Sequence, residues 1–177
     1  MKTFPVTIPA KGYTRKFIHK RYGCPVPINN STLVGVVVSN ILEKKKVYND
    51  ISPVEAMEQR YQRLTDRIEL VITAGKFFHM ALSPVISKEK VIAINRFWEA
   101  LFEEELHMFC QKNIVPGRYS GYDKALDKFA DLYKIDFDVD ITFDALKKME
   151  YRFRKKLELN SSVNVPSGKE LTQSSMF

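Results

Sequence analysis

The residues best placed to do chemistry in this chain are six cations crowded into the stretch 147–156. They are Lys147, Lys148, Arg152, Arg154, Lys155 and Lys156. Glu150 is the only acid in that stretch. Like charges four residues apart on a helix, such as Lys148 and Arg152, repel each other. A phosphate backbone would relieve that repulsion, so the pattern predicts a polyanion-binding surface. A basic helix end also suits the negative pole of the helix dipole, and that simpler interpretation stays open.

A second group of cations lies near the N-terminus, in the expected helix Tyr13–Tyr22. It consists of Arg15, Lys16, Lys20 and Arg21. The formal net charge of the whole chain is +7. Such a balance favours DNA or an acidic protein surface as the partner. Aromatic residues lie among these cations; they could contact nucleic acid or belong to the core.

Two motifs resemble metal sites but lack essential parts. Glu104 and His107 have the spacing used in di-iron helix bundles, but such sites need two of these pairs and further carboxylates. The acids of residues 136–140 resemble the start of a calcium loop. Ile141 stands where that loop needs glycine, and Lys147 stands where it needs a bidentate glutamate. We therefore expect no metal.

Features of an enzyme are also missing from the sequence. The two cysteines, Cys24 and Cys110, carry no signature of a catalytic nucleophile, and no glycine-rich phosphate loop occurs. We expect no catalytic activity and no cofactor. Neither a signal peptide nor a membrane span is expected, because the apolar stretch 33–38 is far too short to cross a bilayer. The small number of cysteines predicts a reducing cytoplasm.

One long helix, about Lys88–Lys112, is expected to position the other elements. Its apolar residues repeat at helical spacing and form a wide stripe, which is typical of a central core helix. They are Val91, Ile94, Phe97, Trp98, Leu101, Phe102, Leu106 and Phe109. The predicted fold is therefore mainly α, a helical domain around one long central helix.

The elements before this helix are predicted to be short. Residues 1–10 form an extended arm, because Pro5 and Pro9 oppose helix. Helices are expected at Tyr13–Tyr22, Thr32–Glu43 and Val54–Thr65, although the valines of the second also suit a strand. Alternation over 68–73 predicts a strand, and residues 76–82 form either its partner in a minor β-hairpin or the start of a helix.

The cations of 147–156 lie on the second of two predicted C-terminal helices. The first is Tyr122–Tyr133, the connection at 135–141 alternates apolar and acidic residues, and the second begins at Thr142. This layout predicts a helix-turn-helix-like pair. The expected domains are an arm (1–11), a helical core with the small hairpin (12–117), the helix-turn-helix-like region (118–158) and a polar tail (159–177).

Several short motifs carry a resemblance to a known group of proteins. They include Tyr22-Gly23-x-Pro25-Val26, Asn95-x-Phe97, Asp140-Ile141-x-Phe143-Asp144 and Tyr151-Arg152-x-Arg154. With them the chain resembles small uncharacterised proteins of Bacteroidetes prophages and mobile elements, and the layout of its last two helices is similar to that of phage helix-turn-helix regulators. The resemblance implies a phage or mobile-element origin, in the bacterial cytoplasm or a phage virion.

Three function classes follow from these observations. The first is a DNA-binding regulator that uses the basic C-terminal helix, with the helix at 13–22 gripping phosphates. The second is a phage virion structural protein, an oligomeric ring or adaptor component whose extended terminal arms contact neighbouring copies or other phage structural proteins. The third is an interaction protein for an acidic partner.

Overall fold

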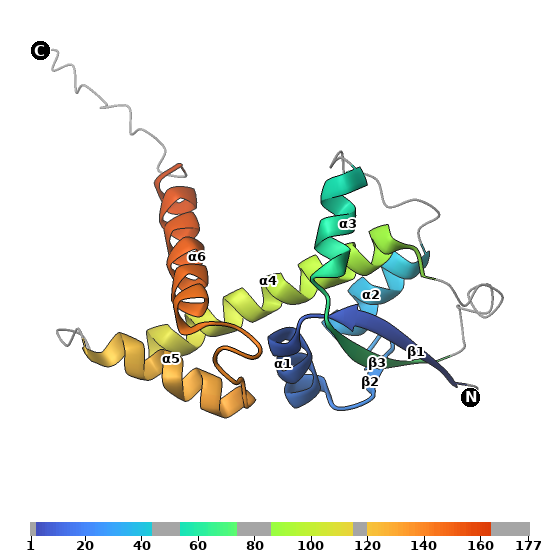
Figure 1. Cartoon of the computed structure of the whole chain (residues 1–177), viewed down its shortest axis with the longest axis horizontal. Coiled ribbons are helices and arrows are strands. Elements are labelled where there is room, and N and C mark those ends of the chain that lie inside the picture. The colour runs from blue at the N-terminus through green and yellow to red at the C-terminus, as the bar shows by residue number, and fades with distance from the viewer. Residues whose placement is uncertain (1–2, 44–53, 74–85, 115–119, 164–177) are drawn as a thin grey trace, which may run out of the picture.

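The computed structural model describes residues 3–43, 54–73, 86–114 and 120–163. The elements are β1 (Thr3–Ala10), α1 (Gly12–Tyr22), β2 (Val26–Ile28), α2 (Leu33–Glu43), α3 (Val54–Gln62), β3 (Asp66–Thr73), α4 (Lys88–Asn113), α5 (Ser120–Tyr133) and α6 (Phe143–Val163). Helix α4 runs through the molecule, with the sheet, α1 and α2 toward one of its ends and α5 and α6 toward the other (Figure 1). Helices α3 and α6 project on the same side of α4 in this view. The expectation of a mainly helical fold is confirmed.

The small sheet has the strand order β1-β3-β2. β1 pairs antiparallel with β3 from Thr3 opposite Thr73 to Ala10 opposite Asp66. β2 pairs parallel with the other edge of β3. The alternation of β1 buries Ile8 and Ala10, so this strand contributes to the core. Residues 3–10 are extended as expected, but they form a sheet strand and not a separate arm.

The predicted hairpin is only partly recovered. The expected strand at 68–73 is present within β3, whereas its proposed partner at 76–82 lies outside the described residues. The partners of β3 in the structure are β1 and β2, which come from the first thirty residues. The sheet is therefore built from segments far apart in the sequence, which local turn signals do not reveal.

The central helix is confirmed as the core of the fold. Trp98, Phe102 and Leu106 of α4 are completely buried. The ring of Phe102 lies 4.8 Å from that of Tyr13 on α1 and 5.4 Å from that of Phe129 on α5, measured between centroids. One residue of α4 thus joins the two ends of the molecule.

Local signals in the sequence explain several helix ends. Gly23 follows α1 with φ of 91°, a left-handed value that glycine adopts without strain, and its N–H donates to the carbonyl of His19. The hydroxyls of Thr32 and Thr142 accept hydrogen bonds from the N–H groups of Gly35 and Ala145 at the starts of α2 and α6. The segment 33–43 is a helix, so the alternative of a valine-rich strand is wrong.

The C-terminal pair is helical as predicted, but the helix-turn-helix assignment is not confirmed. Residues 134–142 connect α5 to α6, whereas a helix-turn-helix uses a turn of roughly three or four residues. Lys134 and Asp138 in this connection have positive φ, and the N–H of Asp138 donates to the carbonyl of Ile141. The connection is thus a folded loop of its own.

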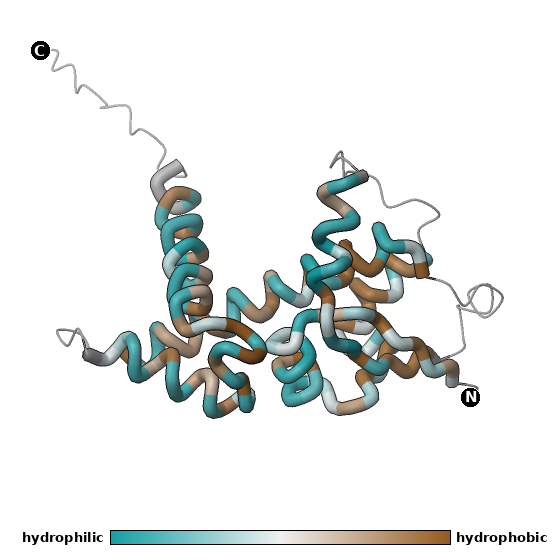
Figure 2. Tube along the Cα trace, viewed as in Figure 1, coloured by the Kyte–Doolittle hydropathy of each residue, from teal (hydrophilic) through white to brown (hydrophobic). Residues whose placement is uncertain are grey.

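Hydrophobic residues concentrate where the sheet, α2 and α4 meet, and hydrophilic residues cover much of α3 and α6 (Figure 2). None of the helices in the described ranges is both long enough and apolar enough to cross a membrane. Helix α6 also carries the six cations from which the sequence predicts a polyanion-binding surface.

Candidate nucleic-acid interface

Three of the predicted cations form an exposed stripe on α6. Leu146 and Glu150 are completely buried and mark the face that packs on the rest of the protein. Lys148, Arg152 and Lys155 are exposed. Their spacing of four and three residues places them along one side of the helix, opposite the buried pair. We call these three residues the α6 stripe.

The cations flanking the α6 stripe are engaged by α5 and by aromatic rings. Lys147 forms an ion pair with Asp123 at 2.7 Å. The guanidinium of Arg154 lies 5.9 Å from the ring centre of Tyr122 and 5.6 Å from that of Tyr151. Both side chains therefore help to attach α6 to α5 or pack along the helix, and they contribute less to an open charged surface.

An exposed aromatic residue lies beside the α6 stripe. Tyr151 is 51% exposed, and the ammonium group of Lys155 lies 6.0 Å from its ring centre. Exposed aromatic rings next to cations stack on bases or pack against sugars in nucleic-acid complexes. The surface therefore offers an aromatic ring for stacking as well as positive charge.

One acid of α4 lies within electrostatic range of α6. Burial raises the pKa of Glu103 and the charge of Glu99 adds to this, whereas Lys156, Lys11 and Arg152 act in the opposite direction. Arg152 and Lys156 are both exposed. Arg152 belongs to the α6 stripe, and Lys156 follows Lys155 in the chain.

Most of the cations of α1 pair with carboxylates of the same chain, and Lys16 is the first example. Its ammonium group donates to the carboxylates of Asp136 and Asp140, the latter at 2.6 Å. Asp140 also accepts from the N–H of Asp136 at 2.8 Å. We call this group the Lys16 clasp. It attaches α1 to the connection between α5 and α6, so the acidic residues of that connection neutralise a predicted DNA contact.

Two further cations of α1 are also bound to carboxylates. Arg15 pairs with Asp66 at 2.8 Å, and Arg21 pairs with Glu105. Lys20 is exposed. Three of the four predicted cations of α1 thus join this helix to β3, α4 and the 134–142 connection. Their charge alone could not show this, because every partner is distant in the sequence.

Sequence reasoning also missed a buried acid at the base of α6. Glu150 is completely buried; its carboxylate lies 3.1 Å from Nδ1 of His107 and accepts a hydrogen bond from the hydroxyl of Tyr122. Burial and the interaction with Glu150 raise the pKa of Tyr122. The three groups join α6 to α4 and α5. The position of Glu150 between Leu146 and Phe153 on the apolar face was the signal available.

The metal motifs do not come together in the described part of the chain. Glu104 is exposed, whereas His107 turns toward Glu150. Within residues 3–43, 54–73, 86–114 and 120–163, no group of three or more His, Cys, Asp or Glu side chains is arranged to hold an ion. Asp136 and Asp140 face Lys16 instead.

The two cysteines differ strongly in reactivity. Cys24 is exposed, whereas Cys110 is completely buried. Burial, with a contribution from Glu150, raises the pKa of Cys110 to about 12, so it remains a thiol at neutral pH. We expect a thiol-disulfide reagent at pH 7.5 to label one thiol per native chain and two in denaturant. Cys24→Ser should abolish the native labelling; rapid labelling of that variant would contradict the buried position of Cys110.

Comparisons of the chain with protein-family models, with curated proteins and with solved structures found no match. A function must therefore be inferred from the geometry of the surface. The α6 stripe is the group of predicted site residues that lies exposed along one side of a helix, and three of the four predicted cations of α1 pair with carboxylates of the fold.

Proposed function

We propose that this protein binds DNA through the exposed face of α6. The observation that supports the proposal is the α6 stripe, which points to solvent directly opposite the buried Leu146 and Glu150. A regulatory role in a phage or mobile element rests on the sequence resemblance alone. Helix α1 is not part of the proposed contact, because most of its cations already bind carboxylates.

The placement of α6 suits contact with a duplex. Its first turns pack on α4 and α5, and the helix then projects away from them (Figure 1). Every residue from Lys155 to Asn160 is exposed. A projecting helix can enter the major groove, which is wide enough to admit it, while cations on its sides reach the phosphates. Contacts of this kind position a protein on DNA without selecting a sequence.

We expect the triple variant Lys148→Gln, Arg152→Gln, Lys155→Gln to bind duplex DNA more weakly, with a shallower dependence on salt. Each phosphate contact contributes about 0.9 to the slope of log K against log salt concentration, so three lost contacts should remove about 2.7 from it. Fluorescence anisotropy of a labelled random duplex, titrated at several salt concentrations, measures both quantities.

A matched control removes the same charge elsewhere. Lys112, Lys124 and Lys128 are exposed on α4 and α5, and their triple replacement by Gln should leave the slope almost unchanged. Equal losses in the two triple variants would show that only net charge matters. An unchanged affinity and slope in the α6 variant would refute DNA binding through this face.

The alternatives receive less support from the structure. The virion hypothesis used residues 1–10 as an arm for neighbouring copies, but β1 pairs with β3 along its full length within the same chain. The other arm, the tail, lies largely outside the described residues. An acidic protein partner would use the same α6 stripe, and retention on heparin without a shift of any DNA would favour it over the duplex.

A further inference from the structure

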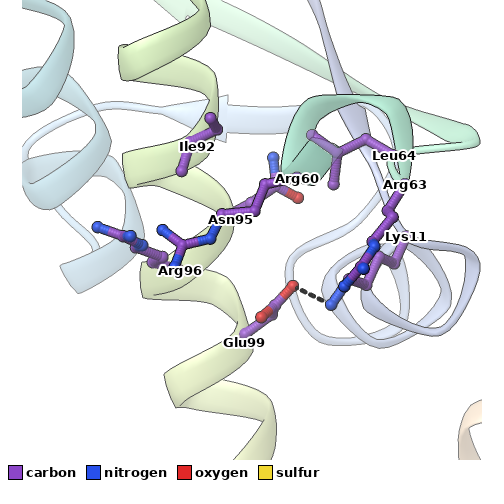
Figure 3. Close-up of a pocket in the computed structure, with 8 residues that line it drawn as sticks. All are labelled: Lys11, Arg60, Arg63, Leu64, Ile92, Asn95, Arg96 and Glu99. Atoms are coloured by element: carbon purple, nitrogen blue, oxygen red, sulfur yellow. Dashed lines mark ion pairs between the residues drawn. The ribbon is translucent and has the colours of Figure 1, made fainter. Parts of the chain in front are cut away.

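A second basic site lies away from α6, in a hollow of about 320 Å³ between α3 and α4 beside the start of α1. Lys11, Arg60, Arg63 and Arg96 line it, with Glu99 as the one carboxylate among its lining residues (Figure 3). Leu64 and Ile92 add apolar surface. The lining residues thus belong to α3, the segment that follows it, α4 and the start of α1.

The charge of this hollow is strongly positive. Glu99 forms an ion pair with Lys11 at 2.8 Å, and the lining residues as a set carry four cations against this one carboxylate. Burial disfavours the charge of Lys11, but Tyr13 and Glu99 outweigh it and raise the pKa of Lys11. Guanidinium groups bind phosphate through two parallel hydrogen bonds, so three of them around one hollow suit a phosphate group.

A buried acceptor lines the same hollow. Asn95 is 4% exposed, and its Nδ2 donates to the carbonyls of Pro9 at 2.8 Å and Val91 at 2.9 Å. These two acceptors fix the orientation of the amide, because an oxygen in that position would repel both. Oδ1 is then left buried with no hydrogen-bond partner in the described part of the chain. The amide points from α4 toward the space beside Lys11 and Arg63 (Figure 3).

We infer that the hollow binds a small phosphate monoester that also carries a hydroxyl or amino group, such as a sugar phosphate or a mononucleotide. The phosphate contacts Arg60, Arg63 and Arg96, and the hydroxyl or amino group donates to Oδ1 of Asn95. An unpaired buried acceptor costs about 1–3 kcal/mol, so a donor on the ligand is favoured there. The volume lies near the lower end of ligand pockets, roughly 300–1,000 Å³, which suits one sugar phosphate unit.

Calorimetric titration at pH 8 tests the inference with ribose 5-phosphate, adenosine 5′-monophosphate, methyl phosphate and inorganic phosphate. Ribose 5-phosphate should bind at one equivalent per chain and at least tenfold more tightly than methyl phosphate, whose dianion has no donor for Asn95. Tighter binding of the nucleotide than of the sugar phosphate would assign the hollow to nucleotides, and the reverse would assign it to sugar phosphates. No saturable binding of either at about 10 mM, or equal binding of methyl phosphate, overturns the inference.

The variant Arg60→Gln, Arg63→Gln should weaken ribose 5-phosphate binding at least tenfold. Both residues are exposed on or just after α3, so the fold should persist. Arg67→Gln, an exposed position on β3, is the matched control and should bind normally. The hollow contains no residue of the α6 stripe, so the inference is independent of DNA binding. The α6 triple variant should therefore still bind ribose 5-phosphate. A different result would overturn the proposal: the native protein binds no monoester, and the Arg60→Gln, Arg63→Gln variant loses affinity for DNA. The hollow would then be a contact for duplex DNA.

Discussion

Replacing Phe102 by alanine should lower the free energy of unfolding by about 3–5 kcal/mol. The ring is completely buried at the middle of α4, with the rings of Tyr13, Phe17 and Phe129 at centroid distances of 4.8, 5.5 and 5.4 Å. Its removal leaves a cavity between α1, α4 and α5 that neighbouring helices cannot fill without moving. Because domains of this size are stable by only about 5–15 kcal/mol, much of the margin would be lost. Urea unfolding followed by circular dichroism measures the change.

Phe97→Ala provides the comparison for this experiment. Phe97 lies on the same helix but is only partly buried, so its truncation removes the same atoms with a smaller loss of contacts. We expect Phe102→Ala to be clearly the more destabilising of the two. Equal effects would mean that the aromatic cluster does not join the two ends of the molecule as described.

The substitution Gly35→Ala should be strongly destabilising. A Cβ at this position on α2 would overlap the carbonyl oxygen of Asn29 and lie 2.7 Å from its nitrogen and 2.9 Å from its carbonyl carbon. These are backbone atoms, so no side chain can rotate away. Overpacking in a well-filled core costs about 1–3 kcal/mol, and a clash with backbone belongs at or above the top of that range. The melting temperature should fall, or the protein should fail to accumulate in folded form.

Gly23→Ala separates steric overlap from backbone strain. Nothing lies within 4 Å of a Cβ added at Gly23, but its φ of 91° is unfavourable for alanine. Positive φ combined with the extended ψ of 174° is adopted almost only by glycine, and sparsely populated backbone of this kind costs about 1–3 kcal/mol. Gly35→Ala should therefore cost more than Gly23→Ala. The opposite order would show that α2 can move away from Asn29 easily.

Local patterns predicted the helices well, because their information lies within the segments themselves. The apolar stripe of α4 identified the core helix, and Gly23 and Thr142 marked helix ends that the structure has at those positions. The sheet could not be foreseen in the same way. β1 and β3 pair across most of the first seventy residues, and β2 is a three-residue strand with little pattern of its own.

The sequence predicted which cations the candidate surface contains, but not which of them pair with acids of the same chain. Six cations on α6 were visible from the sequence, and so were four on α1. What decided their roles was the position of acids elsewhere: Lys16 meets Asp136, 120 residues away, and Arg21 meets Glu105, 84 residues away. Such pairing depends on the tertiary fold. The burial of Glu150 could not be foreseen from its charge for a related reason, since only packing against His107 and Tyr122 makes a buried acid acceptable there.

The Lys16 clasp also bears on the order in which the chain can mature during translation. Lys16 leaves the ribosome early, but Asp136 and Asp140 are made more than a hundred residues later. Pairings this distant form late, and nascent chains expose their unfinished surfaces until then. A fragment ending before Asp136 would carry an uncompensated ammonium group on its first helix. A released fragment that ends at residue 130 should therefore hold α1 more loosely than the full chain.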